Sequence, residues 1–128
     1  MLPPVFPALM ASSAVKAIVG SPPAARVYRH GAAPQGLTEP YITWALVTGQ
    51  PYNTLSELPA VDRQTVQIDC WYQALLIGAN QIETLADAVR DAIEPHAHMT
   101  ATLLDLQEPD TKLYRISMQF DWFLSRAS

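Results

Sequence analysis

The most regular stretch of the chain runs from Thr65 to Ile93 and contains two hydrophobic patterns in succession. Up to Cys70, hydrophobic and polar residues alternate with a period of two, which is typical of a half-buried strand. From Ile82 to Ile93, hydrophobic residues recur at the spacing of one helix face, and mostly charged residues occupy the opposite face. Because neither element can bury its hydrophobic side alone, we expect the helix to lie across a sheet that contains the strand.

The same kinds of pattern predict the other elements. A helix is expected over Val5–Val19, ending at Gly20 because Ser21-Pro22-Pro23 cannot continue it. Asn80 is the expected N-cap of the second helix, which ends before Pro95. The predicted strands are Arg26–Tyr28, Tyr41–Thr48, Thr65–Tyr72, His96–Gln107 and Tyr114–Leu124.

The strand over Tyr41–Thr48 is hydrophobic on both faces, which favours a central or interfacial position. It is followed by the longest stretch without periodicity, from Gln50 to Asp62. Tyr52, Leu55, Leu58 and Val61 make this loop more hydrophobic than a solvated loop needs. They either pack on the core of their own domain or form an arm that orders against a neighbouring subunit.

These elements predict one domain over residues 1–128 with an α+β fold. We expect a mostly antiparallel sheet with two main helices on one face, a long loop between central strands, and a C-terminal β-hairpin. The other face of the sheet is then partly exposed or covered by a partner.

Composition and charge argue against several classes of protein. With 49% hydrophobic and 16% charged residues, the chain has the composition of a folded protein. Its net charge is −4, and nine of its twelve acidic residues follow Thr65. Such a chain lacks the basic stripe that grips a phosphate backbone. No hydrophobic run reaches the roughly 20 residues of a membrane span, and no basic segment precedes Lys16 as a secretory signal would require.

Candidate chemistry is sparse, and we predict no catalytic, cofactor-binding or metal site. Cys70 lies on the hydrophobic side of its strand, where a small buried side chain is expected rather than a nucleophile. His96 and His98 supply at most two metal ligands, fewer than a zinc site needs. Asp69 and Asp121 lie on polar strand faces without a visible partner.

The order of these pieces resembles the tail-terminator, or tail-completion, proteins of long-tailed bacteriophages and gene-transfer particles. The resemblance covers nearly the whole chain, although the connector from Gln73 to Ala79 is a few residues longer than the family leads us to expect. The matching pieces are Ile18-Val19-Gly20, Val27-Tyr28, Ala33-Pro34-Gln35-Gly36, Pro40-Tyr41-Ile42-Thr43-Trp44, Val66-Gln67-Ile68-Asp69-Cys70-Trp71, Leu85-Ala86-Asp87-Ala88-Val89-Arg90 and Leu113-Tyr114-Arg115-Ile116-Ser117-Met118.

The resemblance implies a structural virion protein without cofactors. Members of the family form rings, typically hexamers, that stop polymerisation of the tail tube and join it to the stopper proteins of the head. Genome DNA passes through the lumen without specific binding. The implied partners are further copies of the chain, the tail tube protein and the head-completion protein. The implied location is the tail and neck of the virion, and the host cytoplasm during assembly. Tyr52, Leu55 and Leu58 are then candidates for the subunit interface.

Two other interpretations stay open at this point. A head-completion or adaptor ring, one position further up the neck, would use the same fold features. A small enzyme or ligand-binding α+β domain would need a pocket with convergent polar groups, for which the sequence offers no candidate set.

Overall fold

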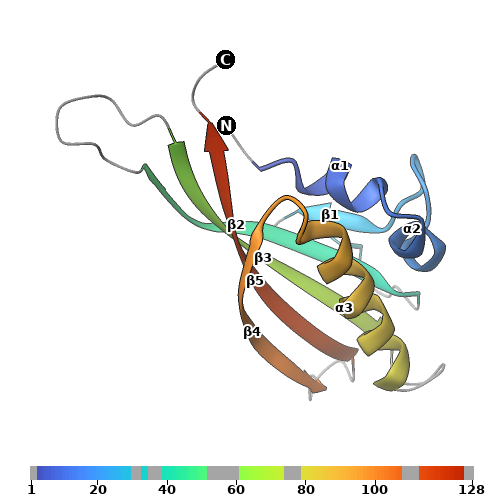
Figure 1. Cartoon of the computed structure of the whole chain (residues 1–128). Coiled ribbons are helices and arrows are strands. Elements are labelled where there is room, and N and C mark those ends of the chain that lie inside the picture. Colours follow the sequence, from blue (N-terminus) through green and yellow to red (C-terminus); the bar gives the residue numbers. More distant parts are fainter. Residues whose placement is uncertain are drawn as a thin grey trace, which may run out of the picture.

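The computed structural model describes residues 3–29, 33–34, 39–51, 61–73, 79–107 and 113–125 (Figure 1). Three helices and five strands occur in this part of the chain. In order, they are α1 (Val5–Met10), α2 (Ser13–Val19), β1 (Val27–Arg29), β2 (Tyr41–Pro51), β3 (Val61–Gln73), α3 (Ala79–Ile93), β4 (His98–Gln107) and β5 (Leu113–Ser125).

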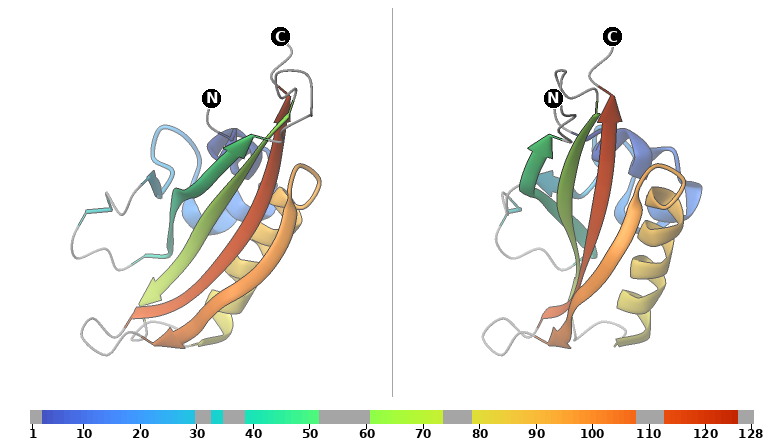
Figure 2. Two further views of the ribbon diagram at one scale, coloured as in Figure 1. Left: turned by 90° about the vertical axis from the view of Figure 1, so that its left-hand side faces the viewer. Right: turned by 60° about the vertical axis from the view of Figure 1, so that its left-hand side comes forward.

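The strands form one sheet in the order β1-β2-β3-β5-β4. Only the short pair of β1 and β2 is parallel, and the other three pairs are antiparallel. All three helices lie on the same face of this strongly twisted sheet (Figure 2). The α+β class, the mostly antiparallel sheet and the hairpin of β4 and β5 are therefore confirmed.

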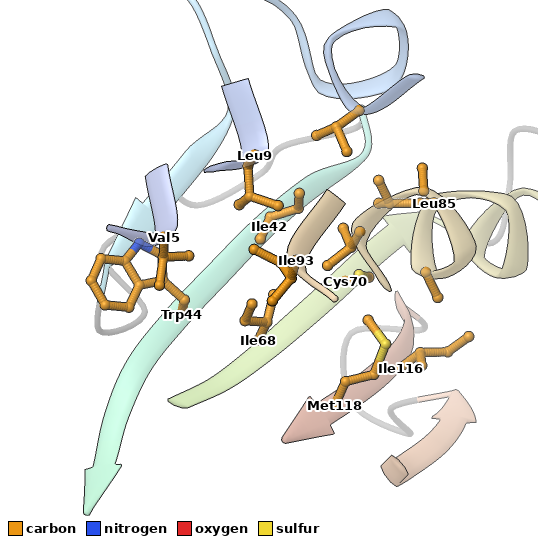
Figure 3. Close-up of a cluster of buried hydrophobic side chains, with 14 of the residues drawn as sticks. Val5, Leu9, Ile42, Trp44, Ile68, Cys70, Leu85, Ile93, Ile116 and Met118 are labelled. Atoms are coloured by element: carbon orange, nitrogen blue, oxygen red, sulfur yellow. The ribbon is translucent and has the colours of Figure 1, made fainter. Parts of the chain in front are cut away.

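The core lies between the helices and the sheet (Figure 3). Ile68 and Cys70 of β3 point toward the helices, and Leu85 and Ile93 of α3 are buried against this face of the sheet. The neighbouring strands continue the layer through pairs on either side of β3, since Cys70 lies opposite both Ile42 and Ile116, and Ile68 opposite both Trp44 and Met118. The alternation expected for β3 and the hydrophobic stripe expected for α3 are both confirmed.

The first helix was predicted as one element and is two. Ser12 separates α1 from α2 because its backbone is extended, with φ −94° and ψ 120°. Its hydroxyl accepts a hydrogen bond from the amide of Val15 at 3.2 Å, so it caps the N-terminus of α2. The break changes the direction of the chain and lets Leu9 and Val19 both reach the core.

The predicted end of this region at Gly20 is confirmed. Gly20 has φ +92°, a conformation that side chains disfavour, and its amide bonds the carbonyl of Lys16 at 2.9 Å. A Cβ at this position would also lie 3.3 Å from the carbonyl oxygen of Ala24.

Several other predicted boundaries are wrong. Gln50 pairs with Arg63 and Pro51 with Asp62, so both ends of the expected loop, Val61 included, belong to β2 and β3. The helix α3 begins at Ala79, which places Asn80 inside it rather than at its cap. The strand β4 starts at His98 instead of His96, because the amides of His96 and Ala97 both bond the carbonyl of Ile93 and close a turn after α3.

The single cysteine offers a test of the core. Cys70 is fully buried, and burial, with the nearby Asp69 carboxylate as a second cause, raises the pKa of its thiol. We expect Ellman's reagent at pH 8 to modify Cys70 only as fast as the chain opens, and at the ordinary thiol rate in denaturant. A Val47→Cys variant is the internal control, because it should show one fast thiol and one slow thiol. Fast modification of Cys70 in the native protein would contradict this packing.

Candidate assembly surface

The sheet face that points away from the helices, here called the outer face, is polar at its centre. Its residues alternate with the core positions along β2, β3 and β5. They are Tyr41, Thr43, Ala45, Thr65, Gln67, Asp69, Trp71, Arg115, Ser117, Gln119 and Asp121.

A hydrogen-bonded cluster around Asp69 joins β3 to β5. The Asp69 carboxylate is only 9% exposed, and its Oδ2 lies 3.0 Å from Nη2 of Arg115. The buried Ser117 hydroxyl donates to Oδ1 of the same carboxylate, and Nε2 of Gln67 donates to Ser117 Oγ at 3.0 Å. Both carboxylate oxygens therefore have partners, which is the condition under which a charge tolerates removal from water.

An aromatic row crosses the outer face beside this cluster. The Arg115 guanidinium lies 4.7 Å from the centre of the Trp71 ring, and Trp71 stacks on Tyr41 with ring centres 5.9 Å apart. Tyr28 meets Tyr41 edge-on at 6.3 Å, so the row connects β1, β2, β3 and β5. The indole of Trp71 also donates to the Thr43 hydroxyl at 3.0 Å. Burial, and to a lesser degree Tyr28, raises the pKa of Tyr41, which stays a neutral phenol.

The second carboxylate for which the sequence showed no partner is also paired. Oδ1 of Asp121 accepts a hydrogen bond from the Thr65 hydroxyl at 2.7 Å, and Oδ2 lies 4.0 Å from Arg63. Thr65 is directly opposite Asp121 in the ladder of β3 and β5. Strand register brings these residues together across more than 50 positions of sequence, so no local pattern could have revealed the pairs.

The outer face is hollowed between β2 and β5, with a volume of about 420 Å³. Asp69, Arg115, Gln67 and Thr43 contribute polar atoms to it, and Val47 lies at its border. Gln67 and Arg115 both bond the Asp69 carboxylate, and the Thr43 hydroxyl accepts a hydrogen bond from the indole of Trp71. No group of three or more His, Cys, Asp or Glu side chains that could hold a metal ion occurs in the described parts of the chain. We find no reactive constellation in the hollow.

Large hydrophobic side chains are exposed toward the end of the sheet where β2 ends and β3 begins, here called the far end. Val47 is 53% exposed at the irregularity where the register of β2 shifts, and Phe123 of β5 is 47% exposed. Phe123 lies opposite Arg63, which in turn lies opposite Gln50, so it is level with the end of β2. A third such residue, Phe6, is 38% exposed on α1. The position of Phe123 among the polar residues of an alternating strand was the signal that sequence reasoning could have used.

The interface residues predicted from sequence, Tyr52, Leu55 and Leu58, lie outside the described residues. They belong to the segment between β2 and β3. The structure describes the two strands on either side of them, and these strands remain paired out to Pro51 and Asp62.

The contacts of His96 and of the acidic residues on α3 are those of structural residues. His96 stacks on Trp122, with ring centres 6.4 Å apart. Acidic residues on the exposed face of α3 surround Arg90, whose side-chain nitrogens lie 3.7 to 3.9 Å from oxygens of Asp87, Asp91 and Glu94. Such exposed pairs contribute little to stability. None of the described helices is long and hydrophobic enough to span a membrane.

The cluster around Asp69 should be important for stability. An Asp69→Ala variant removes the carboxylate and leaves Arg115 in a largely buried position without this ion pair, so we expect the free energy of unfolding to fall by about 3 kcal/mol. Asp87→Ala on the exposed face of α3 is the matched control, with an expected change within about 0.5 kcal/mol. Urea unfolding followed by circular dichroism measures both. Equal effects of the two substitutions would show that the cluster is not a stabilising feature.

Comparisons with known families and with solved structures both point to virion proteins. The sequence profile of the family described as Tail completion protein gp17 matches residues 3–125. Among solved structures, the chain is similar to one described as "Virion of native gene transfer agent (GTA) particle", with a TM-score of 0.63 and 20% sequence identity, over 94% of this chain and 91% of that chain. At this identity the likeness shows the shared fold. No curated protein matches.

The profile accounts for the chain from before α1 to the last residue of β5. This excludes the small-enzyme alternative, because the matched family consists of structural virion proteins. The protein belongs to the tail completion protein family and is a structural component of the virion tail.

Proposed function

We propose that the protein forms a homo-oligomeric ring, a hexamer, that caps the finished tail tube and joins it to the head connector. The observation that supports this most directly is the family match over residues 3–125. A protein that completes a tail must recognise the end of a tube and stop its growth. A closed ring with one tube-binding surface and one head-facing surface meets both requirements.

The far end of the sheet suits contacts between subunits. Val47 of β2 and Phe123 of β5 expose hydrophobic surface there. Hydrophobic side chains of this size that gather on a surface commonly mark a protein interface. The segment that contains Tyr52, Leu55 and Leu58 follows directly from this end of β2.

The charge of the chain suits a conduit for DNA. The net charge is −4, and Arg63 of β3 and Arg115 of β5 lie beside Asp121 and Asp69. A surface whose cations are already paired offers few sites for phosphate groups. Genome DNA would therefore pass the ring without being held.

Mass in solution tests the proposed ring. Light scattering behind a sizing column should give six times the 14.1 kDa mass of the chain, either for the protein alone or after addition of tail tube protein. A chain that stays monomeric in both cases would contradict the ring. Oligomers that bind the portal-side adaptor and ignore tube protein would assign it to the head-completion position instead.

Replacing the hydrophobic residues between β2 and β3 tests the proposed interface. The triple variant Tyr52→Ser, Leu55→Ser and Leu58→Ser should reduce the oligomer to monomers, because ring closure would lose a hydrophobic contact in every subunit. Far-UV circular dichroism should still show a folded chain. The control is Phe6→Ser, which removes an exposed hydrophobic side chain from α1 and should leave the mass unchanged. Normal assembly of the triple variant would mean that these residues pack on their own subunit.

A further inference from the structure

Both borders of the sheet offer backbone groups for pairing. The strand β1 pairs with β2 only from Ile42 to Trp44. Among the described residues, no strand pairs with the outer edge of β2 from Ala45 to Pro51, and none with the outer edge of β4. Figure 1 shows these borders on opposite sides of the sheet. Unpaired strand edges are templates for pairing with another chain.

The two free edges lie at the same level of the sheet. Leu46 of β2 is opposite Val66, Val66 is opposite Phe120, and Phe120 is opposite Met99 of β4. This row of four residues runs from one border to the other. Ala45–Thr48 are therefore level with the beginning of β4, while Gly49–Pro51 extend beyond its first residue. A second copy displaced sideways, with a shift of a few residues along the strands, would bring the two edges together.

The strand directions also fit such a contact. Each of the pairs β2 with β3, β3 with β5, and β5 with β4 is antiparallel, so β2 and β4 run in opposite directions. When a copy is repeated sideways in the same orientation, its β4 runs antiparallel to the β2 beside it. Antiparallel pairing is the commoner and slightly more stable kind.

The edges carry few charged residues. Charged side chains on edge strands are a usual protection against association. Ala45–Pro51 contains no charged residue, and β4 contains only Asp105. Val47 presents an exposed hydrophobic side chain on the free part of β2. Irregularities after Met99 and after Thr102 in β4, and after Leu46 in β2, would interrupt regular pairing at these points.

We propose that the free edge of β2, Ala45–Pro51, pairs antiparallel with the first half of β4 in a second copy of the chain. This inference rests on the proposed ring and specifies how its subunits join. The contact is heterologous, because each copy uses two different edges, and such contacts repeat around a ring when the rotation between copies closes. Backbone hydrogen bonds would supply the contact, as in strand addition to a sheet edge.

Disulfide trapping tests the contact, since strand pairs bring Cβ atoms to within disulfide range on the same face. Val47 borders the hollow of the outer face, while His98 and Ala101 lie opposite the outer-face residues Asp121 and Gln119. Mild oxidation of assembled Val47→Cys/Ala101→Cys, or of Val47→Cys/His98→Cys if the register differs, should give a ladder of covalent oligomers on a non-reducing gel. The native Cys70 is buried and does not contribute.

Two control variants make the result specific. Thr102 lies opposite the core residue Met118, so Val47→Cys/Thr102→Cys places its thiols on opposite faces and should give no ladder. Val47→Cys alone should stay uncrosslinked. Strong dimer formation by that single variant would mean that two β2 edges pair with each other, which overturns the proposal.

Failure of this inference is distinguishable from failure of the ring. If light scattering finds the oligomer but neither double variant gives a ladder, the ring stands and the edge contact is wrong. If the chain stays monomeric with and without tail tube protein, both are wrong.

Discussion

The packing of α3 on β3 and β5 is the contact on which the rest of this structure depends. Leu85, Val89 and Ile93 are fully buried on the helix side, and Ile68, Cys70 and Phe120 on the strand side. The helix can bury this stripe only if the sheet presents its hydrophobic residues on one face. That requirement sets the register of β3 against both neighbours, and the register then determines which polar residues meet on the opposite face.

The outer face has no second layer of helices in the described chain, yet some of its polar residues are buried, namely Thr43, Thr65, Asp69 and Ser117. Asp69, Arg115, Ser117 and Gln67 bond one another there, and the aromatic row that begins at Trp71 lies beside them. Cross-strand pairs of this kind stabilise a sheet. Polar contacts within the chain thus occupy the centre of the outer face, while hydrophobic side chains remain exposed at the far end of the sheet.

This division suits a protein of a virion tail. A two-layer body holds the strands in position, and the proposed assembly surfaces lie at the edges and at the far end of the sheet. In the proposed ring, the net charge of −4 and the pairing of Arg63 and Arg115 with carboxylates would disfavour binding of DNA. Specificity for protein partners would then come from shape and from backbone pairing rather than from charge.

The amino-acid sequence alone was enough to predict the fold class, the strand order along the chain and the core positions of β3, α3 and β5. Periodicity reports which side of an element is buried, and burial dominates folding. It could not predict the break at Ser12, because a side-chain cap competes with a helical pattern that continues through it. The pairing of Asp69 with Arg115 and of Asp121 with Thr65 was decided only by the tertiary structure, since register between distant strands brings these residues into contact.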